Sequence, residues 1–307
     1  MGFLSRLDVL EKSHKLAGIR VLVTGCGFKE VRHVFHDVVS SEPSHDAIVV
    51  DGKEMKLNIG AAVAAVLAVN GATIHLVSRS PDKLAILKTQ LARLTGNPSL
   101  IEFSSCDILD EGAVKRMANS LPNDMPLFWV QSVGLGAGSY KAKDENPYLP
   151  LEEIPLELIE KESQIVIRST HLLMKTLLPR FRVQKETRIA IVTSMSAIRG
   201  YSLGGTHCAA KGAIDRYANS AMLALYKNNI FVTSIRPGAV DTGLYDLPAV
   251  QQAVQIISDE YHGQHRKIFV VAPPVSVGLG VLAALTSPAH IPSINLVAKG
   301  QFPNEGS

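Results

Sequence analysis

Short apolar runs alternate with longer helical patterns along most of the chain, and this alternation constrains the fold more than any other feature. The first run, 19–23, stops at Thr24-Gly25, and the Ala- and Val-rich stretch 59–70 ends before Gly71. Further strands are predicted at 72–77, 100–103, 126–130, 189–194, 231–235 and 294–297, and further helices at 80–94, 111–120, 157–178, 206–225 and 275–285. Apolar strands separated by helices are typical of a parallel sheet covered on both faces. We therefore expect a single doubly wound α/β domain, residues 1–307, with about seven strands.

Two residues mark helix boundaries in this pattern. Ser80 stands directly before Pro81, the usual arrangement of an N-cap followed by proline at the first helical position. Pro179 follows the predicted helix 157–178 and is expected to end it, because proline cannot continue a helix without losing a hydrogen bond.

Two stretches interrupt the alternation. Residues 26–57 follow the first strand, where a tight turn is expected, and we interpret them as an insertion. Within the insertion, 47–50 and 53–57 flank Asp51-Gly52, which predicts a β-hairpin with a type I′ turn. Residues 243–268 follow the sixth strand and mix polar with apolar side chains. A long loop at this end of a strand predicts a substrate lid.

Composition excludes several classes of protein. The 46% hydrophobic content excludes global disorder, and 31 basic against 28 acidic residues give a net charge of +3 without a basic tract, so we expect no nucleic-acid binding. No apolar run reaches the length of a membrane span, and the start lacks a signal-peptide core. The three cysteines predict unpaired thiols in a reducing cytoplasm. His33 and His36 lack further ligands at metal spacing, so no metal is expected.

The first strand ends in a split glycine turn. Thr24-Gly25 opens the turn, and Asn58-Ile59-Gly60 opens the helix that follows the insertion. A glycine turn before a helix N-terminus lets backbone N–H groups approach a pyrophosphate. These residues alone are equally compatible with two unrelated turn and helix glycines.

Later residues follow the same order as the motifs of one known family. They are Ser78-Arg79-Ser80 after the second strand, Asp107 after the third, Gln131-Ser132-Val133-Gly134 after the fourth, Ser194 at the end of the fifth, Lys211 in KGAI, and Pro237-Gly238-Ala239-Val240-Asp241-Thr242. With the split turn, they resemble the TGxxxGIG, NNAG and PGxxxT motifs of the short-chain dehydrogenase/reductase family over residues 19–300.

The resemblance implies a Rossmann-type fold, a nicotinamide cofactor and an oxidoreductase. The cofactor-binding residues that it implies are Thr24, Gly25, Asn58, Ile59, Gly60, Ser78, Arg79, Ser80, Asp107, Ile108, Ser132, Val133, Gly134, Lys211, Pro237, Gly238, Val240 and Thr242. It also implies a homodimer or homotetramer, assembled through the helices at 157–178 and 206–226.

Charge at the end of the second strand bears on the choice of cofactor. An acidic residue there would bind a ribose 2′-hydroxyl and repel a 2′-phosphate, and residues 77–80 contain none. Arg79 stands there instead, with Lys83 one helical turn later. Arginine suits a phosphate because its guanidinium donates two hydrogen bonds. We predict NADP(H) rather than NAD(H); alternatively, Arg79 is a solvated residue at a helix start.

The catalytic residues depart from the family pattern. Ser194 and Lys211 match the family's serine and lysine, but His207 occupies the tyrosine position, thirteen residues after Ser194 and four before Lys211. The family's helix asparagine aligns near Val166. Cys208, beside His207, is interpreted as a small core residue.

Three hypotheses follow for His207. It supplies or relays the proton, as a neutral imidazole whose pKa the Lys211 ammonium lowers. Alternatively, Tyr201 reaches the site from six residues upstream. In the third hypothesis hydride transfer is lost, which leaves a dinucleotide-binding sensor or scaffold, or a non-redox enzyme such as a lyase or isomerase.

The first hypothesis gives the predicted function. It is an NADP(H)-dependent oxidoreductase that acts on a partly apolar carbonyl or hydroxyl compound. Ser194 would bind the substrate oxygen, His207 would supply or relay the proton, and Lys211 would bind the nicotinamide ribose.

Overall fold

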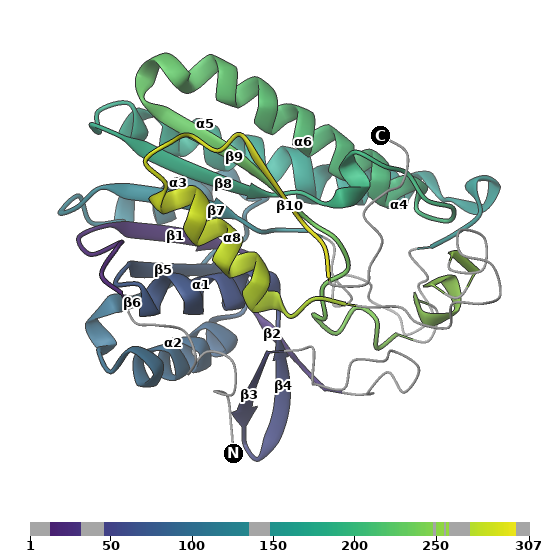
Figure 1. Ribbon diagram of the computed structural model, residues 1–307, viewed down its shortest axis with the longest axis horizontal. Helices are drawn as coiled ribbons and strands as arrows, with labels where there is room; N and C mark the ends of the chain where they lie inside the picture. The colour runs from purple at the N-terminus through teal and green to yellow at the C-terminus, as the bar shows by residue number, and fades with distance from the viewer. Residues whose placement is uncertain are drawn as a thin grey trace.

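Seven parallel strands form the central sheet of the computed structural model, in the part of the chain that the structure describes (residues 13–31, 46–134, 148–247, 250–254, 256–257 and 271–298). The strands are β1 (Arg20–Thr24), β5 (Thr73–Ser78), β6 (Ile101–Ser105), β7 (Leu127–Gln131), β8 (Thr187–Val192), β9 (Ile230–Pro237) and β10 (Ser293–Leu296). Their order is β10-β9-β8-β7-β1-β5-β6, and each pair of neighbours is parallel (Figure 1). The predicted doubly wound fold is confirmed.

The strand order reverses between β1 and β7. From β1 the chain adds β5 and then β6 on one side, and it returns to place β7 on the other side of β1. Thr24 and Gln131, the last residues of β1 and β7, are register partners. In open parallel sheets, ligands bind beyond the carboxyl ends of the strands at such a switch point.

Each face of the sheet carries its own hydrophobic core. The helices are α1 (Ile59–Val69), α2 (Pro81–Thr95) and α8 (Pro274–Thr286) on one face, and α3 (Glu111–Ser120), α5 (Ser169–Phe181) and α6 (Gly205–Leu225) on the other. Alternate strand residues divide between the two cores, as Val21 and Leu22 do. Residues 60–69 of α1 are all buried, which explains the continuous apolar sequence of this helix.

Two predicted boundaries are wrong. The helix predicted at 157–178 consists of α4 (Leu156–Ser163), a π-helical turn (Gln164–Arg168) and α5, and Pro179 lies inside α5 instead of ending it. The helix continues to Phe181, whose ring is fully buried, so packing outweighs the hydrogen bond lost at proline. The strand predicted at 189–194 ends at Val192, because the chain turns after Ser194 into a short 3-10 helix (Met195–Ala197).

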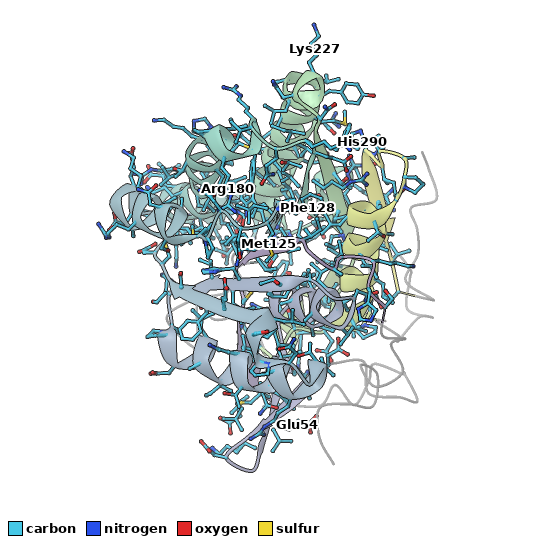
Figure 2. All side chains as sticks on the ribbon, turned by 90° about the vertical axis from the view of Figure 1, so that its left-hand side faces the viewer. Glu54, Met125, Phe128, Arg180, Lys227 and His290 are labelled. Atoms are coloured by element: carbon cyan, nitrogen blue, oxygen red, sulfur yellow. The ribbon has the colours of Figure 1, made fainter. Side chains whose placement is uncertain are left out.

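The insertion forms a small antiparallel sheet of β2 (Phe28–Glu30), β4 (Lys53–Leu57) and β3 (Ala47–Val50), in that spatial order. Asp51 and Gly52, between β3 and β4, both have positive φ angles of 50° and 77°, as a type I′ turn requires. The predicted hairpin is confirmed. Glu54 on this hairpin and Lys227 just after α6 lie at opposite ends of the molecule (Figure 2).

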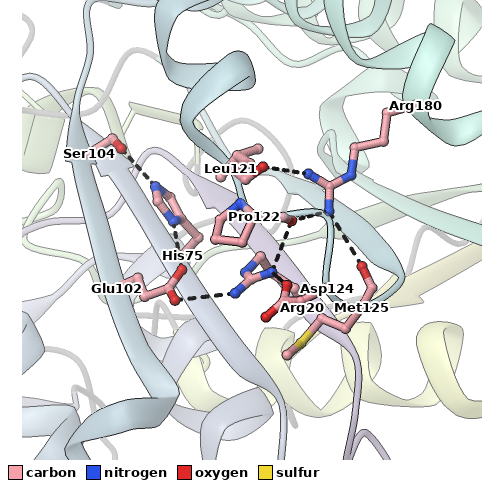
Figure 3. Close-up of polar contacts among 9 residues, drawn as sticks. All are labelled: Arg20, His75, Glu102, Ser104, Leu121, Pro122, Asp124, Met125 and Arg180. Atoms are coloured by element: carbon pink, nitrogen blue, oxygen red, sulfur yellow. Dashed lines mark hydrogen bonds and ion pairs between the residues drawn. The ribbon is translucent and has the colours of Figure 1, made fainter.

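A polar network around buried Arg20 and His75 joins the first residue of β1 to β5 and β6 (Figure 3). Arg20, only 2% exposed, forms ion pairs with Glu102 at 3.2 Å and with Asp124. The ring of His75 lies between Glu102, at 3.2 Å, and Ser104, at 2.8 Å. Burial lowers the pKa of His75, which favours the neutral ring. The network extends from the edge of the sheet opposite to the switch point and pairs the two terminal nitrogens of a buried arginine, whereas Arg20 Nε has no hydrogen-bond partner among the described residues.

The predicted absence of a membrane span and of a metal site can be examined in the described residues only. Within them, no helix is long and apolar enough to cross a membrane, and no group of three His, Cys, Asp or Glu residues is arranged to hold a metal ion. His33 and His36 lie outside the described residues. Cys26, Cys106 and Cys208 are free thiols, and Cys208 is half-buried and lies beside the site described below, not in the core.

Candidate active site

Gly25, Gly60 and Ser132 form a close-packed floor at the switch point. Gly25 has a φ of +89°, and a Cβ atom there would lie 3.0 Å from the carbonyl carbon of Ser132. A Cβ atom on Gly60 would lie 2.5 Å from Ser132 Oγ and 2.7 Å from the carbonyl oxygen of Gly25. Glycine is therefore required at both positions. The turn has the close backbone approach that a pyrophosphate needs beside the N-terminus of α1.

Asn58 holds together the two ends of the insertion, where Gly25 and Gly27 meet Asn58; this junction is called the neck of the insertion. Its Oδ1 accepts hydrogen bonds from the backbone N–H of Ala61 at 2.9 Å and of Gly27 at 3.0 Å, and its Nδ2 donates to the carbonyl oxygen of Gly25 at 2.8 Å. Its backbone N–H donates to the carbonyl oxygen of Gly27 at 3.0 Å. Asn58 thus caps α1, and Ile59 begins that helix. The insertion leaves and rejoins the glycine turn at one point, so the turn stays intact.

The basic pair after β5 is divided by the insertion. Arg79 and Ser80 are exposed and Ser78 is half-buried. Lys83 Nζ, however, donates to the carbonyl oxygen of Phe28 at 3.1 Å and lies 5.5 Å from the centre of its ring. Ser80 occupies the predicted N-cap position of α2 but makes no side-chain capping bond. Both side chains are exposed, but the ammonium of Lys83 is held at the insertion by this hydrogen bond.

The strand ends on either side of the switch point differ in burial. Asp107 is exposed after β6, and its Oδ1 accepts a hydrogen bond from the N–H of Leu109 at 3.0 Å; Ile108 is half-buried. Gln131 is buried and links β1 to α5: it accepts from the Thr24 hydroxyl at 2.5 Å and donates to the Thr170 hydroxyl at 2.6 Å. Ser132, Val133 and Gly134 follow Gln131 and are half-buried.

Lys211 lies between the loops that follow β7 and β8. Its Nζ donates to the carbonyl oxygen of Val192 at 3.4 Å, and a Cβ atom on Gly134 would lie 3.3 Å from the same nitrogen. Ser194 follows β8, and its hydroxyl accepts from Ser196 Oγ at 2.7 Å and donates to the carbonyl oxygen of Pro237 at 3.5 Å. His207 and Lys211 stand one turn apart near the start of α6.

Burial dominates the electrostatics of His207 and Lys211. Burial and then the positive charge of Lys211 lower the pKa of His207 to about 3, so its imidazole is neutral at neutral pH. The predicted effect of Lys211 is confirmed in direction, although burial is the larger cause. Burial also lowers the pKa of Lys211 to about 8, and Glu162 opposes that shift. The site therefore combines a neutral imidazole with an ammonium group that titrates close to neutrality.

Glu162 joins this site and was missed by the sequence analysis as a functional residue. Tyr148, whose position after the fourth strand predicts a contact with substrate, joins the site as well. Glu162 in α4 is only 2% exposed, and its charge raises the pKa of Lys211, Tyr148 and Cys208. One signal could have found it: Glu162 precedes the buried Val166 by four residues, so both lie on one face of the helix.

Tyr201, the alternative proton donor, pairs with Tyr148. The two ring centroids are 6.1 Å apart, the hydroxyl groups share a hydrogen bond, and burial raises the pKa of Tyr148 to about 12. Burial also raises the pKa of Tyr201. Tyr140, which the sequence places in the same loop after the fourth strand, lies outside the described residues, as do His262 and His265 of the predicted lid.

The described part of residues 243–268, the predicted lid, contributes apolar side chains beside this tyrosine pair. Residues 250–254 are helical, and Val250 and Val254 form a buried cluster with Tyr148, against which Leu244 and Tyr245 pack. In the preceding loop, Gly238 N–H donates to the carbonyl oxygen of Leu296 at 2.7 Å, and Val240 pairs with Ala272. Pro237 is buried and Thr242 half-buried. The strand ends thus bring the sequence-predicted groups to one edge of the sheet.

Comparisons with known proteins agree with this geometry. Residues 47–248 match the family described as short chain dehydrogenase. The chain is 22% identical over 209 residues to the uncharacterized oxidoreductase YusZ of Bacillus subtilis, which covers 67% of this chain and 70% of that protein. A short-chain type dehydrogenase/reductase from Mycobacterium ulcerans has the same fold, with a TM-score of 0.69, 21% identity, and coverage of 92% of this chain and 89% of that one.

A second solved structure is the NADPH-bound short chain oxidoreductase of Pseudomonas aeruginosa PAO1, described as containing an atypical catalytic center. It has a TM-score of 0.68 and 18% identity, and covers 94% of this chain and 98% of that one. The family match begins inside the insertion and includes Asn58, Ser194, His207 and Lys211. Since it spans more than half of the chain and the sheet has the expected order, the chain belongs to the short-chain dehydrogenase family of oxidoreductases.

Proposed function

We propose that the protein is an NADP(H)-dependent oxidoreductase that reduces a partly apolar carbonyl compound or oxidises the corresponding alcohol. One observation carries the proposal: the buried ammonium of Lys211 lies against Gly134, beside the close-packed turn of Gly25, Gly60 and Ser132. A lysine at this place can hold a ribose while the turn holds the pyrophosphate.

The residues at the switch point fit a dinucleotide. Gly25 and Gly60 leave no room for side chains, so the backbone itself offers N–H groups at the start of α1. Arg79 is exposed and no acid stands at 77–80, which favours a 2′-phosphate and hence NADP(H) over NAD(H). When bound, the cofactor supplies the hydride that reduces the substrate carbon.

The residues that transfer the proton, His207 and Lys211, lie on α6. Ser194 holds the substrate oxygen by a hydrogen bond, and the neutral His207 ring donates its N–H proton to that oxygen as it becomes an alcohol. Lys211, with a pKa of about 8, is mostly protonated at neutral pH and gives a proton to the other ring nitrogen in the same step, so the ring stays neutral and the lysine becomes an amine. His207 thus relays a proton and need not be an imidazolium.

The surroundings suggest the class of substrate and the assembly. The apolar cluster of Tyr148, Val250 and Val254 favours a substrate with an apolar portion. Exposed apolar side chains on α4, such as Leu156 and Ile159, and Leu223 on α6 favour a homodimer or homotetramer built on these helices. We place the enzyme in the cytoplasm, since its three cysteines are free thiols.

A rival function is a dinucleotide-binding sensor that does not transfer hydride. It is favoured by the low pKa of His207, because a neutral imidazole is a weak acid compared with an imidazolium. A lyase or isomerase that keeps the pocket is a related alternative. Tyr201 as proton donor would require its hydroxyl to exchange Tyr148 for the substrate.

Fluorescence titration with NADPH and NADH, followed by turnover with a panel of carbonyl compounds, tests the proposal. We expect tighter binding of NADPH, loss of this preference in Arg79→Ala, and loss of turnover in Lys211→Ala. Reductase activity that survives in His207→Phe would disprove the relay. Binding of NADPH without turnover of any carbonyl compound would favour the sensor, and absence of NADPH binding would overturn the cofactor assignment.

A further inference from the structure

A buried ion cluster joins the insertion to the loop that follows β9. Lys56 Nζ in β4 lies 2.8 Å from Asp241 Oδ1 and 2.8 Å from Asp246 Oδ1. The three side chains are only 4%, 7% and 6% exposed. Asp241 belongs to the loop of Pro237 to Thr242, and Asp246 to the first part of the lid. Burying three charges is costly, so this cluster is poor evidence for stability and better evidence for a required position.

A second contact holds the other side of the lid. Asp46, which precedes β3, is buried, and its Oδ2 accepts a hydrogen bond from the N–H of Val275 at the start of α8, at 2.5 Å. The carbonyl oxygen of Asp46 accepts from the N–H of Leu57 at 2.7 Å. Since α8 begins just after residues 243–268, the insertion contacts the chain both before and after the lid.

The two sides of the lid also contact each other. Val240 pairs with Ala272 in a parallel bridge, and the N–H of Asp241 donates to the carbonyl oxygen of Ala272 at 3.0 Å. Gly243, with a φ of +81°, lies under the lysine: a Cβ atom there would be 3.8 Å from Lys56 Cδ. Residues 240–243 and residue 272, on either side of residues 248–270, therefore meet at one place that the insertion contacts.

The same small sheet is rooted in the glycine turn. Phe28 of β2 pairs with Leu57 of β4. One residue further, where the small sheet joins the main domain, the N–H of Asn58 donates to the carbonyl oxygen of Gly27. Lys56 is thus two residues from the cap of α1, and a few residues of β4 connect the pyrophosphate turn to the lid.

We propose that Lys56 is a positioning residue: it holds the 237–242 loop and the start of the lid at a fixed place relative to the glycine turn, so that the insertion is a working part of the site. The proposal rests on the proposed function where it assigns the 237–242 loop to the cofactor. The attachment of the insertion to the lid does not depend on that assignment.

Three variants test the kinetic consequence. Lys56→Met removes the cation and leaves two buried carboxylates, whereas Lys56→Met with Asp241→Asn and Asp246→Asn removes all three charges. Lys53→Met is the matched control, because Lys53 lies on the same strand in an exposed ion pair with Glu30 at 3.1 Å. Lys56→Met is expected to weaken NADPH binding by about tenfold or more and to lower kcat, since misplacement by about 1 Å can cost ~100-fold.

The neutral triple variant separates positioning from simple stability. We expect it to regain the melting temperature that Lys56→Met loses, because no charge is left buried without a partner. We expect NADPH affinity and kcat to stay impaired. If the triple variant recovers both stability and kinetics, Lys56 only neutralises two carboxylates and the proposal is wrong.

Hydrogen exchange without cofactor provides a readout that needs no activity. Lys56→Met should speed amide exchange in residues 239–247 and 272–276, and Lys53→Met should not. Unchanged exchange in Lys56→Met would overturn the proposal even if the variant binds NADPH more weakly. Faster exchange there, in a protein that binds no dinucleotide, would instead refute the proposed function and leave the attachment of the lid established.

Discussion

Gly60 and Ser132 approach so closely that a Cβ atom on Gly60 would lie 2.5 Å from Ser132 Oγ. It would also lie 2.7 Å from the carbonyl oxygen of Gly25, which cannot rotate away as a hydroxyl can. Gly60→Ala must therefore push α1 away from the floor of the site. We expect a loss of about 1–3 kcal/mol in the free energy of unfolding and a large loss of NADPH affinity, measured by urea unfolding and fluorescence titration.

Two further variants sharpen this prediction. Gly60→Ala combined with Ser132→Gly removes the hydroxyl but leaves the backbone contact with Gly25, so affinity should not return. In Gly212→Ala the new Cβ would meet only an ordinary contact, 3.7 Å from the carbonyl oxygen of Ala197. That helical substitution should leave stability unchanged or raise it by about 0.5–1 kcal/mol. Wild-type NADPH affinity in Gly60→Ala would contradict the assignment of the pyrophosphate floor.

Asn58→Ala should lower the free energy of unfolding by about 2 kcal/mol, because it removes the cap of α1 and two bonds across the neck of the insertion. Ser80→Ala is the control: Ser80 holds the same position at the start of α2 but makes no side-chain capping bond. Its effect should stay within about 0.5 kcal/mol. Equal losses in the free energy of unfolding for the two variants, measured by urea unfolding, would show that the side chain of Asn58 does not stabilise α1 and the neck of the insertion.

His207 should make the protein less stable in acid. Its pKa is about 3 in the folded protein, well below the usual value of 6.5. The unfolded chain therefore binds more protons below pH 6.5, and the stability present above that pH is lost progressively as the pH falls towards 3. Between pH 7 and pH 5 the contribution of His207 to the free energy of unfolding should fall by up to about 2 kcal/mol.

Urea unfolding of the wild type and of His207→Gln at pH 7 and pH 5 measures this difference. His75, whose pKa burial lowers as well, is present in both proteins, so its contribution cancels in the comparison. The variant should lose less stability on acidification than the wild type. Identical losses would mean that folding does not lower the pKa of His207.

Local chemistry explains which features could be predicted from the sequence. The strands are buried on both faces, so their apolar runs stand out, and Asp51-Gly52 predicts its hairpin because two successive positive φ angles favour these residues. The order of Gly25, Ser194 and Lys211 places the first two at the carboxyl ends of parallel strands and Lys211 on the helix α6 beside them, once the sheet is known.

The features that could not be predicted depend on contacts between distant segments. Lys56 meets Asp241 across 185 residues, and nothing in the sequence near either residue indicates the pair. Lys83 was expected to face a phosphate, but its ammonium donates a hydrogen bond to the carbonyl oxygen of Phe28 in the insertion. Pro179 predicts a helix end, but the helix continues to Phe181. The burial of Phe181 against distant segments stabilises this last part of α5, and the local sequence does not show it. Such contacts outweigh local propensity.

Glu162 should set the pH range in which Lys211 stays charged. Burial lowers the pKa of Lys211 to about 8, and the carboxylate of Glu162 raises it relative to burial alone. Glu162→Gln keeps the size of the side chain and removes the charge, so the pKa of Lys211 should fall below 8. If the ammonium binds the ribose, NADPH affinity should then weaken at a lower pH than in the wild type. The measurement is NADPH affinity from pH 6 to pH 9.

The other ionisable groups around this cluster are His207, Cys208 and the three tyrosines Tyr148, Tyr201 and Tyr245. Their pKa values lie away from this range or are raised further by burial, so the basic limb near pH 8 belongs to Lys211. Glu160→Gln is the matched control, since Glu160 is exposed on the same helix. It should leave the midpoint unchanged. A midpoint in Glu162→Gln that stays at the wild-type pH, or moves to a higher one, would show that Glu162 does not hold the charge of Lys211, whatever its effect on stability.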